Sequence, residues 1–181
     1  MTTVTEKTAS IAMSDYMAKY RNVRRFLEYC KQCPRYGNLW CCPPFDHDID
    51  LSDYNQVLLI GTTIHFDDAT RAACHTPEES NATAKQSIDE VWKDLLPRLY
   101  QLERSHPGSR CFTIQCRLCG KQDCTRPQGQ PCRHPGKLRN SLEAIGFDVE
   151  ATARDLLGIT LEWSTDGLLP RAITLVTALF H

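Results

Sequence analysis

Nine of the ten cysteines in this chain of 181 residues lie in two short segments, and their neighbours are mostly Gly, Pro, Arg and Gln. Thiols that only fill a core are expected among Val, Leu and Ile, at the spacing of a helix or a strand. These cysteines are therefore interpreted as metal ligands. The first group is Cys30, Cys33, Cys41 and Cys42, and the second is Cys111, Cys116, Cys119, Cys124 and Cys132.

The second group contains a complete ligand set. Four thiolates within 17 residues can close around one Zn²⁺ or one iron–sulfur cluster: Cys116, Cys119, Cys124 and Cys132. From residue 110 to residue 139 the chain has seven Lys and Arg against Asp123 alone. These cations would lower thiol pKa values and offset the negative charge of a thiolate site. A nucleic-acid surface is the weaker interpretation of the same charges, because Phe112 is the single aromatic residue of that segment.

The first group supplies three ligands, Cys30, Cys33 and Cys42, the last followed by Pro43 and Pro44. Cys42 is preferred to its neighbour Cys41 because a Cys-Pro pair also closes a bacterial ferredoxin motif. The side chains of two adjacent cysteines point in different directions, so both cannot easily bind one metal. No fourth ligand is evident from the spacing. One alternative is an open coordination position, as in metal sites that do chemistry. The candidate fourth ligands are Cys41, Cys74, Cys111 and His47.

The spacing favours iron–sulfur, as 4Fe-4S clusters, over zinc, because zinc ribbons usually present two facing Cys-x2-Cys pairs. The leading functional hypothesis is a cytoplasmic iron–sulfur protein that transfers electrons to or from a redox partner protein. Two alternatives stay open. One is a reductase or sulfur-handling enzyme with an open three-cysteine site, and the other is a zinc-stabilised interaction module. Neither a nucleic-acid nor a membrane partner is expected, and no glycine motif for a nucleotide is present.

Three stretches of sequence together resemble a prokaryotic family of predicted metal-binding proteins. They are C-x2-C-x2-YG-x2-W-x-CPP from Cys30, C-x2-C-x4-C-x7-CR from Cys116, and S-x-EA-x-G-x-DV from Ser141. The resemblance supports seven ligands and a cytoplasmic location: Cys30, Cys33, Cys42, Cys116, Cys119, Cys124 and Cys132.

Three further residues are expected at the cofactor. Tyr36 and Trp40 are expected to flank the first site as a dry lid. Arg133 is expected to bond a ligand sulfur or a nearby carboxylate. The segment 141–149 is expected to cap and pack helices behind the second site.

Composition is that of a soluble globular protein, with 41% hydrophobic residues, 24% charged residues and a net charge of −1. No secretory signal is visible at the N-terminus, so a reducing compartment is expected, where structural disulfides are rare. The longest mostly apolar stretch, 172–180, is too short to span a bilayer.

The elements that must position the cysteines follow from periodicity and capping. Helices are expected over 14–29, 136–145 and 148–157. A further long helix is expected to begin at a capping box at Thr76 and to kink at Pro97. Strands are expected over 56–66, 110–115, 159–164 and 171–180. The predicted fold is α/β (α+β): a small central β-sheet with packed helices and two cysteine-rich metal-binding loops. Residues 1–181 form one metal-binding domain, with the loops at 30–44 and 111–135.

Overall fold

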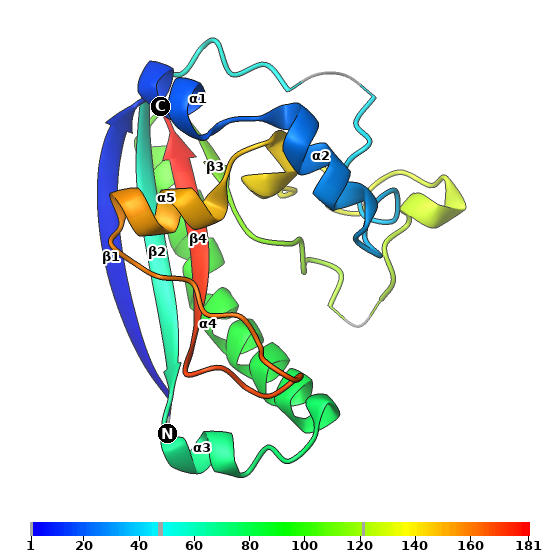
Figure 1. The fold of residues 1–181 in the computed structure, drawn as a ribbon. Coiled ribbons are helices and arrows are strands. Elements are labelled where there is room, and N and C mark those ends of the chain that lie inside the picture. The colour runs from blue at the N-terminus through cyan, green and yellow to red at the C-terminus, as the bar shows by residue number, and fades with distance from the viewer. Residues whose placement is uncertain (1, 47–48, 121) are drawn as a thin grey trace.

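The computed structural model describes residues 2–46, 49–120 and 122–181. Its centre is a curved sheet of four antiparallel strands in the order β1-β2-β4-β3 (Figure 1). The strands are β1 (Thr2–Ala12), β2 (Gln56–Phe66), β3 (Arg110–Phe112) and β4 (Ala172–Phe180). The predicted mixed α/β fold with one small sheet and packed helices is confirmed.

One face of the sheet is covered by the long helix α4 (Pro77–Ser105) (Figure 1). It begins at the predicted capping box, in which Thr76 and Glu79 satisfy each other's backbone N–H groups. Leu95 and Leu99 on its inner face are buried against Ile60 of β2 and other residues of the sheet. Two short elements lie elsewhere in the chain: α3 (Asp68–Ala72) before α4, and the 3-10 turn η1 (Arg126–Gln128).

The opposite face packs against α1 (Met13–Tyr20), α5 (Val149–Leu156) and the 3-10 turn η2 (Glu143–Ile145). Tyr16 of α1 is fully buried, stacked on Phe147 with ring centres 4.4 Å apart. Its hydroxyl lies 3.0 Å from Oγ1 of Thr152, so its one polar atom is satisfied inside the core. Asp148 caps α5 by accepting from the N–H of Ala151.

The helix predicted over 14–29 is two helices in the structure. Arg21 has an extended backbone, with φ −105° and ψ 124°, which ends α1. Asn22 then caps α2 (Val23–Lys31) by accepting from the N–H of Arg25. Because of this break, α2 leaves the sheet and carries Cys30 away from the main body (Figure 1).

Three other sequence predictions were wrong in whole or in part. The segment 159–164 forms no strand: Ile159 and Leu161 pack against the apolar core instead, and β1 already pairs with the free edge of β2. The helix expected over 136–145 is reduced to η2. The strand from Arg110 ends at Phe112. No helix in the described ranges combines the length and apolar character needed to cross a membrane.

Candidate metal centre

The two cysteine-rich loops lie against each other, beside one end of the sheet (Figure 1). Trp40 in the first loop donates from Nε1 to Oγ1 of Thr125 and to the carbonyl of Gln130, both at 3.2 Å. Arg126 in the second loop donates to backbone carbonyls of the first, including that of Leu39 at 2.7 Å. Segments more than 80 residues apart in sequence therefore form one unit.

Cys30, Cys33 and Cys42 line one cavity of about 240 Å³. Cys30 lies in the last turn of α2, and two successive turns follow, in which Cys33 N bonds Cys30 O and Tyr36 N bonds Cys33 O, both at 3.0 Å. Cys42 returns to the same cavity after a further turn closed by its N–H on the carbonyl of Leu39. The three predicted ligands of the first group thus share one cavity wall.

Polar groups that sequence reasoning missed share this first cavity. Arg35, Ser141 and Glu143 all line it. Glu143 arrives there because η2 packs against α2. Residues 141–149 were expected behind the second site, and that placement is wrong: they cap α5 and border the first cavity. No local pattern could signal this, since it depends on the docking of α2.

The second set surrounds a separate cavity of about 180 Å³ that is partly open to solvent. Its four half-buried thiols are Cys116, Cys119, Cys124 and Cys132. The backbone N–H of His134 donates to the sulfur of Cys132 at 3.4 Å. Arg133 donates from Nη1 to Cys119 sulfur at 3.7 Å and to the carbonyl of Asp123 at 2.7 Å. Arg133 therefore lies where it was expected, on a predicted ligand sulfur.

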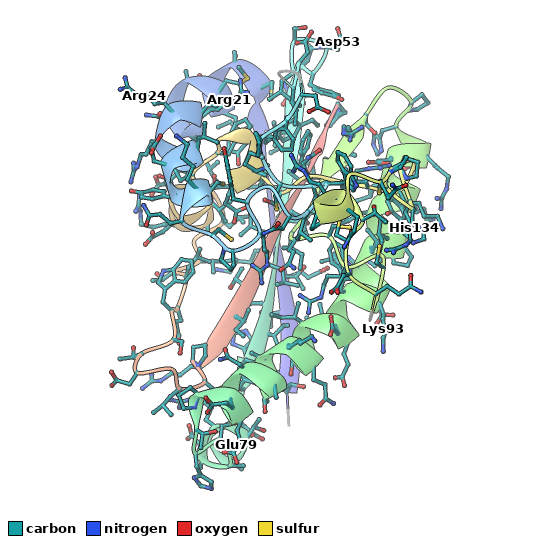
Figure 2. All side chains as sticks on the ribbon, turned by 90° about the vertical axis from the view of Figure 1, so that its right-hand side faces the viewer. Arg21, Arg24, Asp53, Glu79, Lys93 and His134 are labelled. Carbon is teal, nitrogen blue, oxygen red and sulfur yellow. The ribbon has the colours of Figure 1, made fainter. Side chains whose placement is uncertain are left out.

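Two ion pairs and a hydrogen bond fasten the second loop to α4. Arg117 pairs with Asp89, and Arg139 forms a two-point pair with Glu103 whose side chains are each 13% exposed. Between them, the hydroxyl of Tyr100 donates to the carbonyl of Lys137. In Figure 2 the segment carrying His134 accordingly lies beside α4. The helix is the rigid support on which this loop is held.

Cys41 lies between the two cavities and lines both of them. It is 1% exposed, its sulfur is 3.8 Å from that of Cys42, and it accepts from the N–H of Cys116 at 3.4 Å. Its carbonyl accepts from Nδ2 of Asn140 at 3.2 Å. One residue thus connects a predicted ligand of the first set with a predicted ligand of the second.

Thiol pKa values differ between the two neighbouring cysteines. The hydrogen bond from the Cys41 thiol lowers the pKa of Cys42, with a smaller contribution in the same direction from Arg35. The pKa of Cys41 itself is raised to about 12, where its bond with Cys42 and burial outweigh the lowering by Cys116. Cys42 is therefore the member of the pair that more readily supplies a thiolate, which agrees with its choice as the ligand.

The remaining cysteines do not reach either cavity. Cys111 is fully buried against α4, where its thiol donates to the carbonyl of Leu99 at 3.2 Å and burial raises its pKa to about 12. Cys74 is buried beside α3, within hydrogen-bond distance of Thr70 and Thr83. His47, the other candidate fourth ligand, lies outside the described residues. Among the candidate fourth ligands that the structure describes, Cys41 is the one that lies beside the first set of thiols.

The two aromatic residues expected at the first site, Tyr36 and Trp40, lie at different cavities. Tyr36 lines the first cavity as expected. Trp40 lines the second cavity rather than the first, because its indole N–H is held by Thr125 and Gln130 of the second loop. The indole thus forms part of the wall of the second cavity.

The donor chemistry of both cavities fits a thiophilic metal group. Each cavity is bordered by its own set of thiols and by a cation, Arg35 at the first and Arg133 at the second. N–H donors already reach two of the sulfurs, those of Cys119 and Cys132. Within the described ranges, no three His, Cys, Asp or Glu side chains are gathered closely enough to hold one metal ion. Metal binding would therefore draw the thiols inward from these positions.

Comparison with known proteins identifies the family of this chain. No curated protein and no solved structure matches the chain. A family model described as "Predicted metal-binding protein (DUF2284)" matches residues 17–180, which include both cysteine sets and most of the sheet. The chain therefore belongs to the DUF2284 family of predicted metal-binding proteins.

Proposed function

We propose that this protein is an iron–sulfur protein of the reducing cytoplasm that transfers electrons, with one cluster at each cysteine set and a redox partner protein. The observation that carries the proposal is the position of Cys41, which forms part of the wall of both thiol-lined cavities. Two redox groups in these cavities would be separated by little more than one side chain. Electron transfer weakens steeply with distance, so such neighbours exchange electrons readily.

Cavity size supports a cluster over a single zinc ion. The second cavity has a volume of about 180 Å³ and the first about 240 Å³. A water molecule needs only about 10–15 Å³ of such space, so each cavity has room for a group of several atoms. In the second set, Cys116, Cys119, Cys124 and Cys132 would hold a 4Fe-4S cluster. Such a cluster supplies one-electron chemistry when it is bound.

The chain's own residues would hold and tune these groups. Arg133 and the N–H of His134 direct positive charge at Cys119 and Cys132, which offsets thiolate charge. Trp40 forms part of the wall of the second cavity and would limit the access of water on that side. Hydrogen bonds to ligand sulfurs and exclusion of solvent are the means by which a protein sets a cluster's potential.

Anaerobic purification followed by metal analysis tests the proposal. The protein should be brown and bleached by dithionite, with about eight iron and eight sulfide per chain if both sets hold a 4Fe-4S cluster. Cys33→Ser and Cys119→Ser should each lose about half of the iron. Cys74→Ser is the matched control and should keep it all, because Cys74 lies near neither cavity. A colourless protein with stoichiometric zinc would contradict the proposal.

A second candidate function is a reductase or a sulfur-handling enzyme that binds its substrate at an open position of the first site. It is favoured by the polar side chains of Arg35, Ser141 and Glu143, which share the cavity with only three predicted ligands. Iron analysis of Cys41→Ser separates the two cases. If this variant loses the first cluster, Cys41 completes the coordination and the open-site enzyme is excluded.

A further inference from the structure

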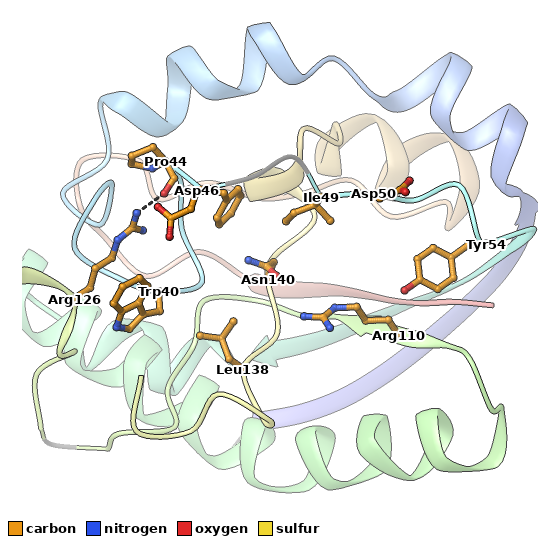
Figure 3. A pocket seen from close by; sticks show the side chains of 11 residues that line it. Trp40, Pro44, Asp46, Ile49, Asp50, Tyr54, Arg110, Arg126, Leu138 and Asn140 are labelled. Atoms are coloured by element: carbon orange, nitrogen blue, oxygen red, sulfur yellow. Dashed lines mark hydrogen bonds between the residues drawn. The ribbon is translucent and has the colours of Figure 1, made fainter. Parts of the chain in front are cut away.

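A third cavity, of about 460 Å³, lies beside the cysteine loops and contains none of the cysteines (Figure 3). It is larger than either thiol-lined cavity. Much of its lining is apolar or aromatic: Trp40, Phe45, Ile49, Tyr54 and Leu138. Pockets of this size with an apolar lining and a few polar groups are typical binding sites for small molecules.

Arg110 provides the polar anchor of this cavity. It begins β3, is half-buried, and reaches into the cavity toward Asn140, with Tyr54 at the same end (Figure 3). In the described part of the chain its guanidinium group forms neither an ion pair nor a hydrogen bond. The nearby carboxylate of Glu103 is already engaged by Arg139 and by the N–H of Cys111.

Two other charged residues of the cavity, Arg126 and Asp50, are engaged locally. Arg126 lies at the opposite end, where it donates to the carbonyls of Leu39, Cys42 and Pro44. Asp46 lies beside Arg126 in Figure 3. Asp50 accepts from the N–H of Ser52 at 2.9 Å, within its own turn. Arg110 is therefore the cation that is available to a ligand.

We propose that this cavity binds a small organic monocarboxylate with a flat apolar body. The fork of N–H groups on Arg110 matches a carboxylate at two points, and the ligand's body would lie among Trp40, Tyr54 and Leu138. Trp40 and Leu138 also line the second cysteine cavity. A ligand in this site would thus lie one side chain away from the second set of thiols. The proposal goes beyond electron transfer and does not depend on which metal the thiols bind.

Isothermal titration calorimetry with 2-naphthoate and the metal-loaded protein tests this site. The wild-type protein should bind 2-naphthoate and should bind the neutral 2-naphthalenemethanol at least tenfold more weakly. Arg110→Gln should weaken naphthoate binding roughly 10- to 100-fold, because hydrogen bonds to a charged group contribute about 1.5–3 kcal/mol. Arg110→Lys keeps the charge but lacks the fork of N–H groups. Its affinity for 2-naphthoate should therefore lie between those of the wild type and Arg110→Gln.

Arg104→Gln is the matched control, because it removes the same charge from an exposed position near the end of α4. It should bind 2-naphthoate like the wild type. Equal weakening in both glutamine variants would reveal a general charge effect and overturn the proposal, as would equal binding of the acid and the alcohol. No binding of 2-naphthoate at millimolar concentration would also overturn it. Unchanged iron content and circular dichroism of Arg110→Gln would establish that a loss of binding is not a loss of fold.

Discussion

Arg126 is the side chain that joins the two cysteine loops. Its guanidinium group bonds the carbonyls of Leu39, Cys42 and Pro44, and its central carbon lies 5.3 Å from the centre of the Trp40 ring. A planar group with five N–H donors can satisfy several carbonyls while stacking on an aromatic ring. Lysine cannot do both at once, because its ammonium is a compact charge without a planar fork of N–H donors.

Arg126→Lys should therefore lower the free energy of unfolding by about 1–3 kcal/mol, because part-buried carbonyl acceptors would lose their charged donor. Urea unfolding of the metal-loaded protein measures this change. Arg24→Lys is the matched control, since Arg24 is an exposed residue of α2, away from the second loop (Figure 2). A loss below about 0.5 kcal/mol in Arg126→Lys, the range typical of surface substitutions, would contradict a joining role for Arg126.

At the scale of elements, the position of α2 depends on Gly146. This glycine has φ +95°, and a Cβ atom placed on it would lie 2.7 Å from the Cα atom of Val23 at the start of α2. The carbonyl of Gly146 also accepts from the N–H of Asn22 at 2.8 Å. Close backbone contact at this point holds α2, and hence Cys30, against the wall formed by Glu143.

Gly146→Ala should be destabilising by at least about 2 kcal/mol, because it adds a strained left-handed residue and a clash with backbone. It should also reduce the metal bound at the first site, since α2 must shift. Gly136→Ala is the matched control, because a Cβ atom there meets nothing within 4 Å. Urea unfolding and metal analysis measure the two effects. If the two alanine variants prove equally stable, the contact with Val23 does not position α2.

Elements with strong local signals were predicted well from sequence. The apolar run of β2 and the capping box of α4 marked where these elements begin. β1 was missed because it is an edge strand exposed along most of its length, so its sequence has no alternating apolar pattern. Its many threonines were the available signal, since β-branched residues favour strands.

The candidate site was also predictable only where its signal is local in the sequence. Cysteine spacing is a local signal, and the two ligand sets do line two cavities. Their adjacency through Cys41 was not predictable, because it follows from how the two loops dock. The same holds for two contacts with the first cysteine loop. Glu143 reaches it only when α2 and η2 have packed together, and Arg126 only when the second loop has closed over the first.

At the scale of the whole molecule, two parts differ in what stabilises them. The sheet has apolar clusters on both faces, with α4 on one side and α1 and α5 on the other. The cysteine loops lie to one side of the sheet (Figure 1), and many of their residues are exposed. Hydrophobic burial thus stabilises the sheet, whereas the loops depend on a few polar tethers, to which a bound metal would add.

Removal of the metal should therefore loosen the loops without unfolding the sheet. Hydrogen–deuterium exchange, compared between the loaded protein and protein stripped with a chelator, measures this directly. Amides of β2, β4 and α4 should keep their protection, because their hydrogen bonds lie among buried apolar side chains. Amides of residues 30–46 and 114–138 should exchange much faster after stripping. Cys74→Ser, which keeps both ligand sets, should behave like the wild type in both states. If β4 lost protection together with the loops, metal binding would be coupled to folding of the whole chain, as in a zinc finger, and the division into two parts would be wrong.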